Sequence, residues 1–234
     1  MRRKIYILLV CCLFVGCEII DEADRLIPVE TMSEGERTHV LLEFTGFRCV
    51  NCPSAVETAQ SLQSLYGERL IVVALHPASN PFTQGKYDYT CPAADSIYQY
   101  MGGSSSTPFP TGNIDMKQVD GRCFFAPPEW PAQLTKAIEE ESKEEQAIFR
   151  TSYWLVEDSV LGVQAMPDGT IDMNYYHRHV LRAVSEEPNI TIPDGCNTAH
   201  CTIVKLILDT KDNHILNAYE TKLDAIDSMS SMDD

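Results

Sequence analysis

Apolar and polar positions change their spacing between the two halves of the chain. In the first half, short apolar runs predict strands at 40–44, 70–75 and 111–116, and helical spacing predicts helices at 54–66, 93–101 and 130–146. From about residue 148, alternating runs separated by turn residues predict strands at 148–157, 160–164, 177–184, 201–208 and 215–223. The pattern therefore predicts an α/β fold followed by a C-terminal all-β unit, either sandwich-like or an extension of the first sheet.

The first residues have the pattern of an export signal. Residues 1–16 join a basic start to an apolar run that is too short to span a bilayer, and the stretch LFVGC at 13–17 is typical of a lipoprotein cleavage site. Cleavage before Cys17 leaves its thiol for acylation, for example by palmitate. Glu18 is not the aspartate that holds many lipoproteins at the inner membrane, so we predict a lipid anchor at the outer membrane, on its periplasmic or its surface face.

Composition marks the remaining boundaries. Residues 17–36 are rich in acids and have little periodicity, which indicates a tether. The first domain is predicted at 37–147 and the β-unit at 148–227, and residues 228–234 form an acidic tail.

The chain is strongly acidic. Its 18 basic and 34 acidic residues give a formal net charge of -16. Loss of Arg2, Arg3 and Lys4 with the signal leaves 15 basic residues against 34 acidic ones, or -19. Such a surface argues against a nucleic-acid partner and against polybasic docking on anionic lipid. We expect the protein to contact the membrane through its N-terminal lipid. The sequence does not indicate whether the protein self-associates.

Two cysteines stand where the first predicted strand gives way to a helix. Cys49 and Cys52 are separated by two residues and precede the helical spacing of 54–66. A thiolate at a helix N-terminus is stabilised by unpaired backbone N–H groups and by the helix dipole. We therefore expect Cys49 to be the more exposed thiol, with a lowered pKa to which Arg48 contributes.

The stretch VLLEFTGFRCVNCP at 40–53 resembles the active-site region of the thioredoxin superfamily. Glu43 stands six residues before Cys49, where a thioredoxin carries its buried acid, and TPFPT at 107–111 resembles the loop with a cis-proline, for which we choose Pro110. The centre of the motif departs from the superfamily, because Val50-Asn51 replaces glycine and proline and Arg48 replaces tryptophan.

This resemblance implies a thioredoxin-like fold and thiol–disulfide exchange. Cys49 would attack a substrate disulfide as a thiolate, Cys52 would resolve the mixed disulfide, and Glu43 would relay the proton of Cys52. Pro110 and Thr111 would offer backbone to an extended substrate segment, beside Arg48. No cofactor is expected. A stable, non-exchanging disulfide is the competing interpretation, because disulfides persist in exported proteins without turnover.

A more specific resemblance extends into the second half. WLVEDSVLGVQ at 154–164 and YYHRHVLRAV at 175–184 resemble the C-terminal half of the outer-membrane-protein-28-related lipoproteins, which open with a stretch similar to LLEFTGFRCVNCP at 41–53. The resemblance implies a lipid-anchored, thioredoxin-like envelope protein, and exported proteins with disulfides are the partners we expect for an exchange reaction. It names no substrate, and a non-catalytic binding, receptor or adhesin role is the alternative.

Six cysteines remain after the signal peptide and the lipid anchor are set aside. Cys49 with Cys52 and Cys196 with Cys201 are the local disulfide pairs, and Cys91 with Cys123 follows only by elimination. A zinc site would need a second pair of ligands at similar spacing, and none occurs.

Three histidines stand near the predicted site or share a predicted strand. His177 and His179 alternate along a predicted strand near Glu157 and Asp158, which makes a metal site conceivable, but histidines hydrogen-bonded in a polar strand pair are favoured and no metal is predicted. His76 follows the predicted strand 70–75 and is in reach of the cysteine pair, with a capping or packing role favoured.

Overall fold

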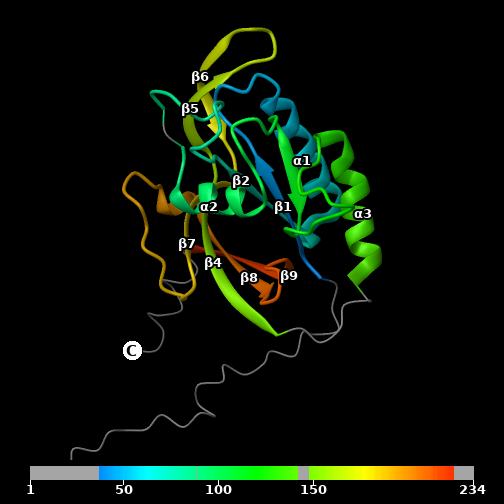
Figure 1. The fold of residues 1–234 in the computed structure, drawn as a ribbon. Coiled ribbons are helices and arrows are strands. Elements are labelled where there is room, and N and C mark those ends of the chain that lie inside the picture. Colours follow the sequence, from blue (N-terminus) through cyan, green and yellow to red (C-terminus); the bar gives the residue numbers. More distant parts are fainter. Residues whose placement is uncertain (1–36, 88, 142–147, 224–234) are drawn as a thin grey trace, which may run out of the picture. The chain divides into compact units, whose positions relative to one another are not determined.

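A seven-stranded mixed sheet organises the computed structural model, which describes residues 37–87, 89–141 and 148–223 (Figure 1). Its strand order is β3-β1-β2-β7-β4-β8-β9, and β5 and β6 form a separate two-stranded sheet. The strands are β1 (His39–Phe44), β2 (Leu70–Leu75), β3 (Thr111–Ile114), β4 (Phe149–Glu157), β5 (Val160–Ala165), β6 (Ile171–His177), β7 (Val180–Ser185), β8 (Cys201–Asp209) and β9 (Ile215–Lys222). The helices are α1 (Cys52–Tyr66), α2 (Pro92–Tyr100) and α3 (Trp130–Glu140), with short 3₁₀ turns at Gly67–Arg69, Pro127–Glu129 and Thr198–His200.

The predicted mixed α/β class is confirmed, and the sandwich-like arrangement is not. Strand β2 runs parallel to both β1 and β7, and β4 pairs antiparallel with β7 and with β8, so the C-terminal strands continue the first sheet edge to edge. The described residues all belong to one compact unit. The predicted boundary at 147, the signal peptide and tether at 1–36 and the tail at 228–234 lie outside the described residues.

One predicted strand was placed wrongly. The sequence pattern predicts a strand at 177–184, whereas β6 ends at His177 and β7 begins at Val180. His179 between them has a left-handed backbone, with φ 54°, which cannot continue a strand. The chain turns at this point from the small β5–β6 hairpin into the main sheet, and most of β6 was missed.

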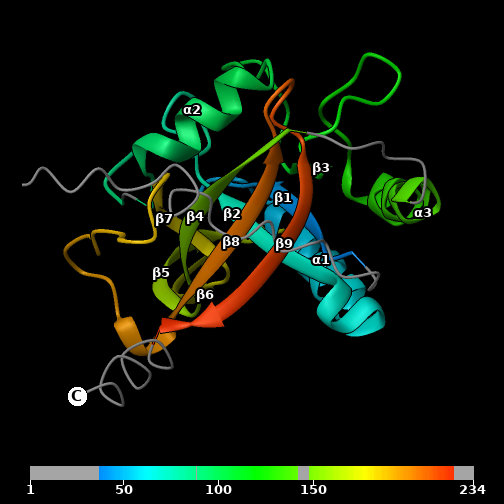
Figure 2. The same ribbon diagram turned by 90° about the horizontal axis from the view of Figure 1, so that it is seen from below.

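The two faces of the main sheet are covered by different helices. Figures 1 and 2 place α2 on the side of the sheet opposite to α1 and α3. Alternate residues of β1 divide accordingly: Val40, Leu42 and Phe44 join the buried cluster that includes α2, and Leu41 joins the one that includes α1 and α3. Glu43 shares the face of Leu41. Among the described residues, no helix has the length and apolar character needed to cross a membrane.

A buried polar cluster lies at the start of β1. His39 is fully buried, and its Nδ1 and Nε2 lie 2.6 Å from Asp115 Oδ2 and 2.6 Å from Glu141 Oε1. Arg37 Nη2 donates to Asp115 Oδ2 at 3.0 Å, and Arg69 Nη2 lies 2.5 Å from Glu141 Oε1. Buried charges are tolerated when they are paired in this way. The cluster joins β1 to the segments that follow β3 and α3.

Candidate functional site

Cys49 and Cys52 are joined in a disulfide at the start of α1, with a Cα–Cα distance of 5.4 Å. Each cysteine is only 1% exposed. The expectation that Cys49 presents an exposed thiol is therefore wrong for this state. Its neighbours Arg48, Val50 and Asn51 are exposed, so the loop reaches the surface while its sulfur atoms do not.

The β5–β6 hairpin is hydrogen-bonded to the cysteine loop. Gln164 Nε2 donates to the carbonyl oxygen of Cys49 at 2.9 Å, and the backbone N–H of Ala165 donates to the carbonyl oxygen of Phe47 at 2.8 Å. Gln164 is itself buried. The hairpin therefore holds the disulfide loop at two places.

The hairpin also packs closely on the segment that follows β2. The N–H of Val163 donates to the Tyr89 hydroxyl oxygen at 2.8 Å. A Cβ at Gly162 would lie 1.8 Å from this oxygen, so the close approach requires glycine. Three segments distant in sequence thus meet around the disulfide: its own loop, the segment after β2 and the hairpin.

Glu43 lies in the middle of β1 and is buried. It is 2% exposed, and its Oε1 has no hydrogen-bond partner among the described residues. Burial raises the pKa of Glu43 to about 8. At neutral pH this carboxyl is therefore mainly protonated and is able to donate a proton.

We expect Glu43→Gln to flatten the pH dependence of stability. The folded protein holds this proton up to about pH 8, whereas the unfolded chain releases it near the usual value of 4.5. Glu43 therefore lowers the free energy of unfolding as pH rises between these values, by at most about 1.4 kcal/mol per pH unit. Urea unfolding of both proteins from pH 5 to 9 checks this, and a pH-independent difference between them contradicts it.

The loop that contains Pro110 connects α2 to β3. The Phe109–Pro110 peptide bond is cis, as predicted for Pro110. Thr111 is buried, its hydroxyl donates to the carbonyl oxygen of Phe125 at 3.1 Å, and its backbone pairs with Phe44. Its side chain is therefore engaged within the fold. Arg48, the third predicted substrate contact, is exposed, and its Nη1 donates to the carbonyl oxygen of Gln84 at 3.3 Å.

A small cavity lies beside Cys52. His76 and His177 both line it, together with Tyr175 and Gln164 of the hairpin. The two imidazole rings have centroids 5.7 Å apart. Burial lowers the pKa of His177 to about 4 and holds that of His76 well below its usual value, so both rings are neutral at physiological pH. The sequence indicated that His76 is in reach of the cysteines, but it gave no signal that the hairpin completes this cavity.

The second predicted disulfide is not formed. Cys196 and Cys201 are free cysteines, as are Cys91 and Cys123. The sulfur atoms of Cys196 and Cys201 each have another hydrogen-bond partner. Arg182 Nε donates to Cys196 Sγ at 3.2 Å, and Cys201 Sγ donates to the carbonyl oxygen of Asn197 at 3.3 Å. Local spacing indicated this pair, but the hydrogen bond to Cys196 comes from Arg182 of β7, which the spacing does not include.

The structure separates the two histidines considered for metal binding. His177 ends β6, whereas His179 lies in the turn that follows, so they do not share a strand face. A different group, Asp209, Asp212 and His214, places potential ligand atoms within 4.8 Å of one another at the β8–β9 turn. His214 Nδ1 already lies 2.5 Å from Asp212 Oδ1, and such acidic turns are common without a metal.

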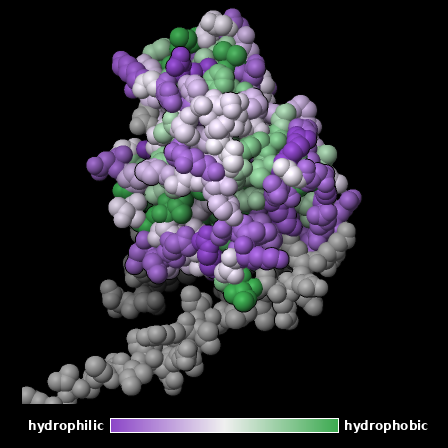
Figure 3. Space-filling view, viewed as in Figure 1, coloured by the Kyte–Doolittle hydropathy of each residue, from purple (hydrophilic) through white to green (hydrophobic). Residues whose placement is uncertain are grey.

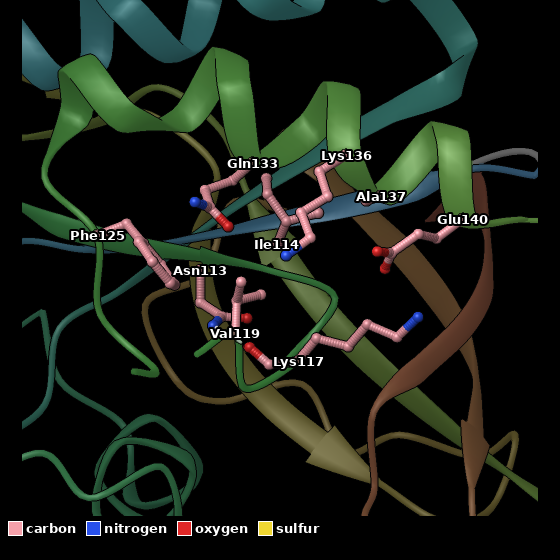
Figure 4. Close-up of a pocket in the computed structure, with 9 residues that line it drawn as sticks. All are labelled: Asn113, Ile114, Lys117, Val119, Phe125, Gln133, Lys136, Ala137 and Glu140. Carbon is pink, nitrogen blue, oxygen red and sulfur yellow. Dashed lines mark hydrogen bonds between the residues drawn. The ribbon is translucent and has the colours of Figure 1, made fainter. Parts of the chain in front are cut away.

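A further pocket lies between α3 and the segment after β3 (Figure 4). Gln133, Lys136 and Glu140 of α3 face Asn113 and Lys117 across it. Its lining contains no cysteine and no histidine. The cysteine pair and the cavity beside it therefore remain the candidate site.

Comparison with known proteins supports the fold and not a particular activity. A scan of protein-family models finds no match to this chain, and neither does a search of curated proteins. Among solved structures, the chain is similar to HBP35 of Porphyromonas gingivalis, with a TM-score of 0.58 and 15% sequence identity over 81% of this chain and 76% of that one. A crystal structure from Agrobacterium tumefaciens matches 80% of this chain and 95% of its own at 11% identity and a TM-score of 0.48. The fold and the site together define a mixed α/β protein with a buried CxxC disulfide.

Proposed function

We propose that this protein is a thioredoxin-like thiol–disulfide exchange protein whose CxxC pair is covered by its C-terminal hairpin. The observation that supports this proposal most directly is the Cys49–Cys52 disulfide at the N-terminus of a helix. The strand before this helix contains the buried, protonatable carboxyl of Glu43. When a donor opens this disulfide, Glu43 supplies a proton to the Cys52 thiolate. In the reduced protein, Cys49 attacks a substrate disulfide, and Cys52 resolves the mixed disulfide.

The thioredoxin-like assignment rests on the order of elements around the cysteines. Strand β1, helix α1 and the parallel strand β2 follow one another, and β3 pairs antiparallel with β1 directly after the cis bond at Pro110. The fold similarity to HBP35 supports the same assignment.

The cellular setting is the second part of the proposal. The pattern ending at Cys17 supports export and a lipid anchor at the outer membrane, and the motif blocks at 41–53, 154–164 and 175–184 support membership of the outer-membrane-protein-28-related lipoproteins. Substrates are then exported proteins with disulfides.

The alternative is a binding protein that uses the fold as a scaffold and keeps its disulfide closed. Burial of both cysteines favours it, and so do four large apolar residues of the hairpin that are more than half exposed: Leu161, Ile171, Met173 and Tyr176. Figure 3 shows apolar side chains at the end of the molecule where Figure 1 places this hairpin. A partner bound equally by the wild type and by a Cys49→Ser/Cys52→Ser variant distinguishes this role.

The reduction potential of the Cys49–Cys52 pair tests the proposal, measured by equilibration with glutathione and thiol trapping. For an exchange protein we expect a value within roughly -120 to -270 mV. A pair that stays oxidised below about -300 mV is a structural disulfide and contradicts the proposal.

The kinetic part of the same test uses Gln164→Ala. Loss of one hydrogen bond of about 0.5–1.5 kcal/mol makes opening of the hairpin easier, so dithiothreitol should reduce the disulfide roughly 2- to 13-fold faster. Gln133→Ala, a change of the same kind in the pocket of Figure 4, is the matched control and should leave the rate unchanged. Equal rates for the wild type and Gln164→Ala contradict the role of the hairpin as a cover.

A further inference from the structure

Strand β6 of the hairpin is an edge strand. In the described part of the chain it pairs with β5 and with no other strand. Strand β5 is also held by the rest of the molecule, because the N–H groups of Val163 and Ala165 donate to the Tyr89 hydroxyl oxygen and to the carbonyl oxygen of Phe47. An edge strand presents unpaired backbone N–H and C=O groups, which form a template for pairing with another chain. Strand β6 is therefore open to an added strand.

Four large apolar side chains of the hairpin are exposed to solvent. Ile171 and Met173 of β6 are 64% and 57% exposed, and the cross-strand partners Tyr176 and Leu161 are each 56% exposed. The hairpin lies at the end of the molecule where Figure 3 shows apolar side chains. Apolar side chains scattered singly on a surface are normal, whereas a group of them marks an interaction site. The hairpin therefore offers apolar contacts as well as a free strand edge.

One row of side chains leads along β6 to the disulfide. Side chains two residues apart in a strand point to the same face, so Ile171, Met173, Tyr175 and His177 form one row. Burial increases along this row, from the exposed Ile171 and Met173 through the partly buried Tyr175 to the buried His177. Tyr175 and His177 line the cavity beside Cys52. A segment paired along β6 therefore has one end next to the disulfide loop.

The hairpin is acidic. Between Val160 and His177 the sequence has Asp168 and Asp172 but no lysine or arginine. Hydrogen bonds from Thr170 hold the pKa of Asp168 below its usual value, so this exposed carboxylate is charged at neutral pH. A second copy of the chain would bring the same formal net charge of -16, and like charges oppose association. The complementary partner is a segment that carries lysine or arginine.

The turn between β5 and β6 holds the two strands in a fixed geometry. The N–H of Met166 donates to the carbonyl oxygen of Thr170 at 2.9 Å, and the N–H of Gly169 donates to the carbonyl oxygen of Met166 at 3.0 Å. Asp168 Oδ1 accepts from the N–H and the hydroxyl of Thr170 at 2.9 and 2.6 Å. A binding edge that is formed in advance lowers the cost of ordering on binding.

We propose that β6 binds, as an added strand, an extended segment of a disulfide-bonded substrate protein in which apolar residues alternate with lysine or arginine; this inference rests on the exchange function proposed above. The backbone of the segment pairs with the free edge of β6. Its apolar side chains pack on Ile171 and Met173, and its cations lie on the opposite face, the side of Asp172. The hairpin then selects the substrate, and a cysteine at the end of the bound segment reaches the disulfide loop.

Peptide binding to the oxidised full chain tests the docking site directly. The probe is a short fluorescent peptide in which valine alternates with lysine, and binding is followed by fluorescence anisotropy. Ile171→Thr/Met173→Thr should weaken binding roughly tenfold, because two apolar contacts are lost. The same peptide with N-methylated backbone amides cannot donate to β6 and should bind about tenfold more weakly to the wild type. Ile148→Thr, at an 81% exposed apolar residue outside the hairpin, is the matched control and should bind like the wild type.

Charge variants and salt test the choice of partner. A peptide in which glutamate replaces lysine should show no binding, and binding of the lysine peptide should weaken as salt is raised. Asp172→Asn keeps the Oδ1 acceptor that the N–H of Asn174 uses and removes the charge, so it should weaken binding of the lysine peptide about 2- to 5-fold.

Two exchange reactions separate docking from chemistry. The reduced wild type and Ile171→Thr/Met173→Thr should reduce oxidised glutathione at equal rates, because this small disulfide does not need β6. A disulfide joined to the valine–lysine peptide should react about tenfold less efficiently with the variant, through KM and not through kcat.

Each result has a defined meaning. Unchanged peptide binding by Ile171→Thr/Met173→Thr, or undiminished binding of the N-methylated peptide, overturns docking on β6; Met173→Thr alone is the second variant if the double variant does not fold. Self-association of the wild type that the variant abolishes, measured by analytical ultracentrifugation, makes a second copy the occupant and also overturns the proposal. Peptide binding without any exchange with glutathione overturns the exchange function and leaves β6 as the docking site of a binding protein.

Discussion

Replacement of Cys49 by serine is expected to abolish thiol–disulfide exchange. Cys49 precedes the first turn of α1, so we expect its sulfur to act as the attacking thiolate once the hairpin opens. Cys52→Ser should keep the attack and stop at the mixed disulfide, because the resolving thiol is missing. The measurement is the rate of reduction of a disulfide-bonded peptide by the reduced protein, with non-reducing electrophoresis to detect the trapped complex.

The matched control for this prediction is Cys123→Ser. Cys123 is a partly buried free cysteine that does not line the cavity beside Cys52, and its replacement should leave the exchange rate unchanged. Exchange activity that survives in Cys49→Ser, or an absence of trapped complex with Cys52→Ser, removes these cysteines from the reaction and leaves the binding alternative.

The largest loss of stability is expected from His39→Leu. The imidazole lies between Asp115 and Glu141, at 2.6 Å from each, and Asp115 is fully buried. Leucine fills the space but donates no hydrogen bond, so the fully buried Asp115 and the partly exposed Glu141 each lose a partner. Removing one member of a buried charged cluster costs about 3–5 kcal/mol. Urea unfolding at pH 7 measures the loss.

Two further variants show whether the charged cluster or simple packing is responsible. Arg122→Gln removes an exposed ion pair with Glu129 and should change the free energy of unfolding little. Asp115→Asn in the His39→Leu background should recover part of the lost free energy, because it removes a buried charge that has lost one of its partners while Arg37 remains beside it. A loss below about 1 kcal/mol for His39→Leu, or no recovery in the double variant, contradicts this account.

Most elements of the fold could be predicted from local pattern. The helical spacing after the cysteines, the apolar runs of β1 and β2 and the alternating runs of β4, β8 and β9 all correspond to observed elements within a few residues. The failure at 177–184 has a local cause, the left-handed backbone at His179: histidine is enriched in that conformation, but its presence in an alternating run does not by itself predict a turn. The arrangement of the C-terminal strands could not be predicted either, because alternating apolar and polar positions do not indicate which strand β7 pairs with.

The candidate site, like the fold, could be predicted from the sequence only in part. The sequence by itself determined the CxxC pair at a strand–helix junction, the acid on the strand before it and the proline at the start of β3, because these depend on short-range order. Only the tertiary structure decided that the sulfur atoms are buried, since Gln164 contacts the carbonyl oxygen of Cys49 across a separation of 115 residues. It likewise decided that His76 and His177 line one cavity with Cys52. Packing between segments distant in sequence sets the exposure of the cysteine sulfur atoms and the pKa values of the groups around them. No local sequence pattern predicts which distant segment packs over the disulfide.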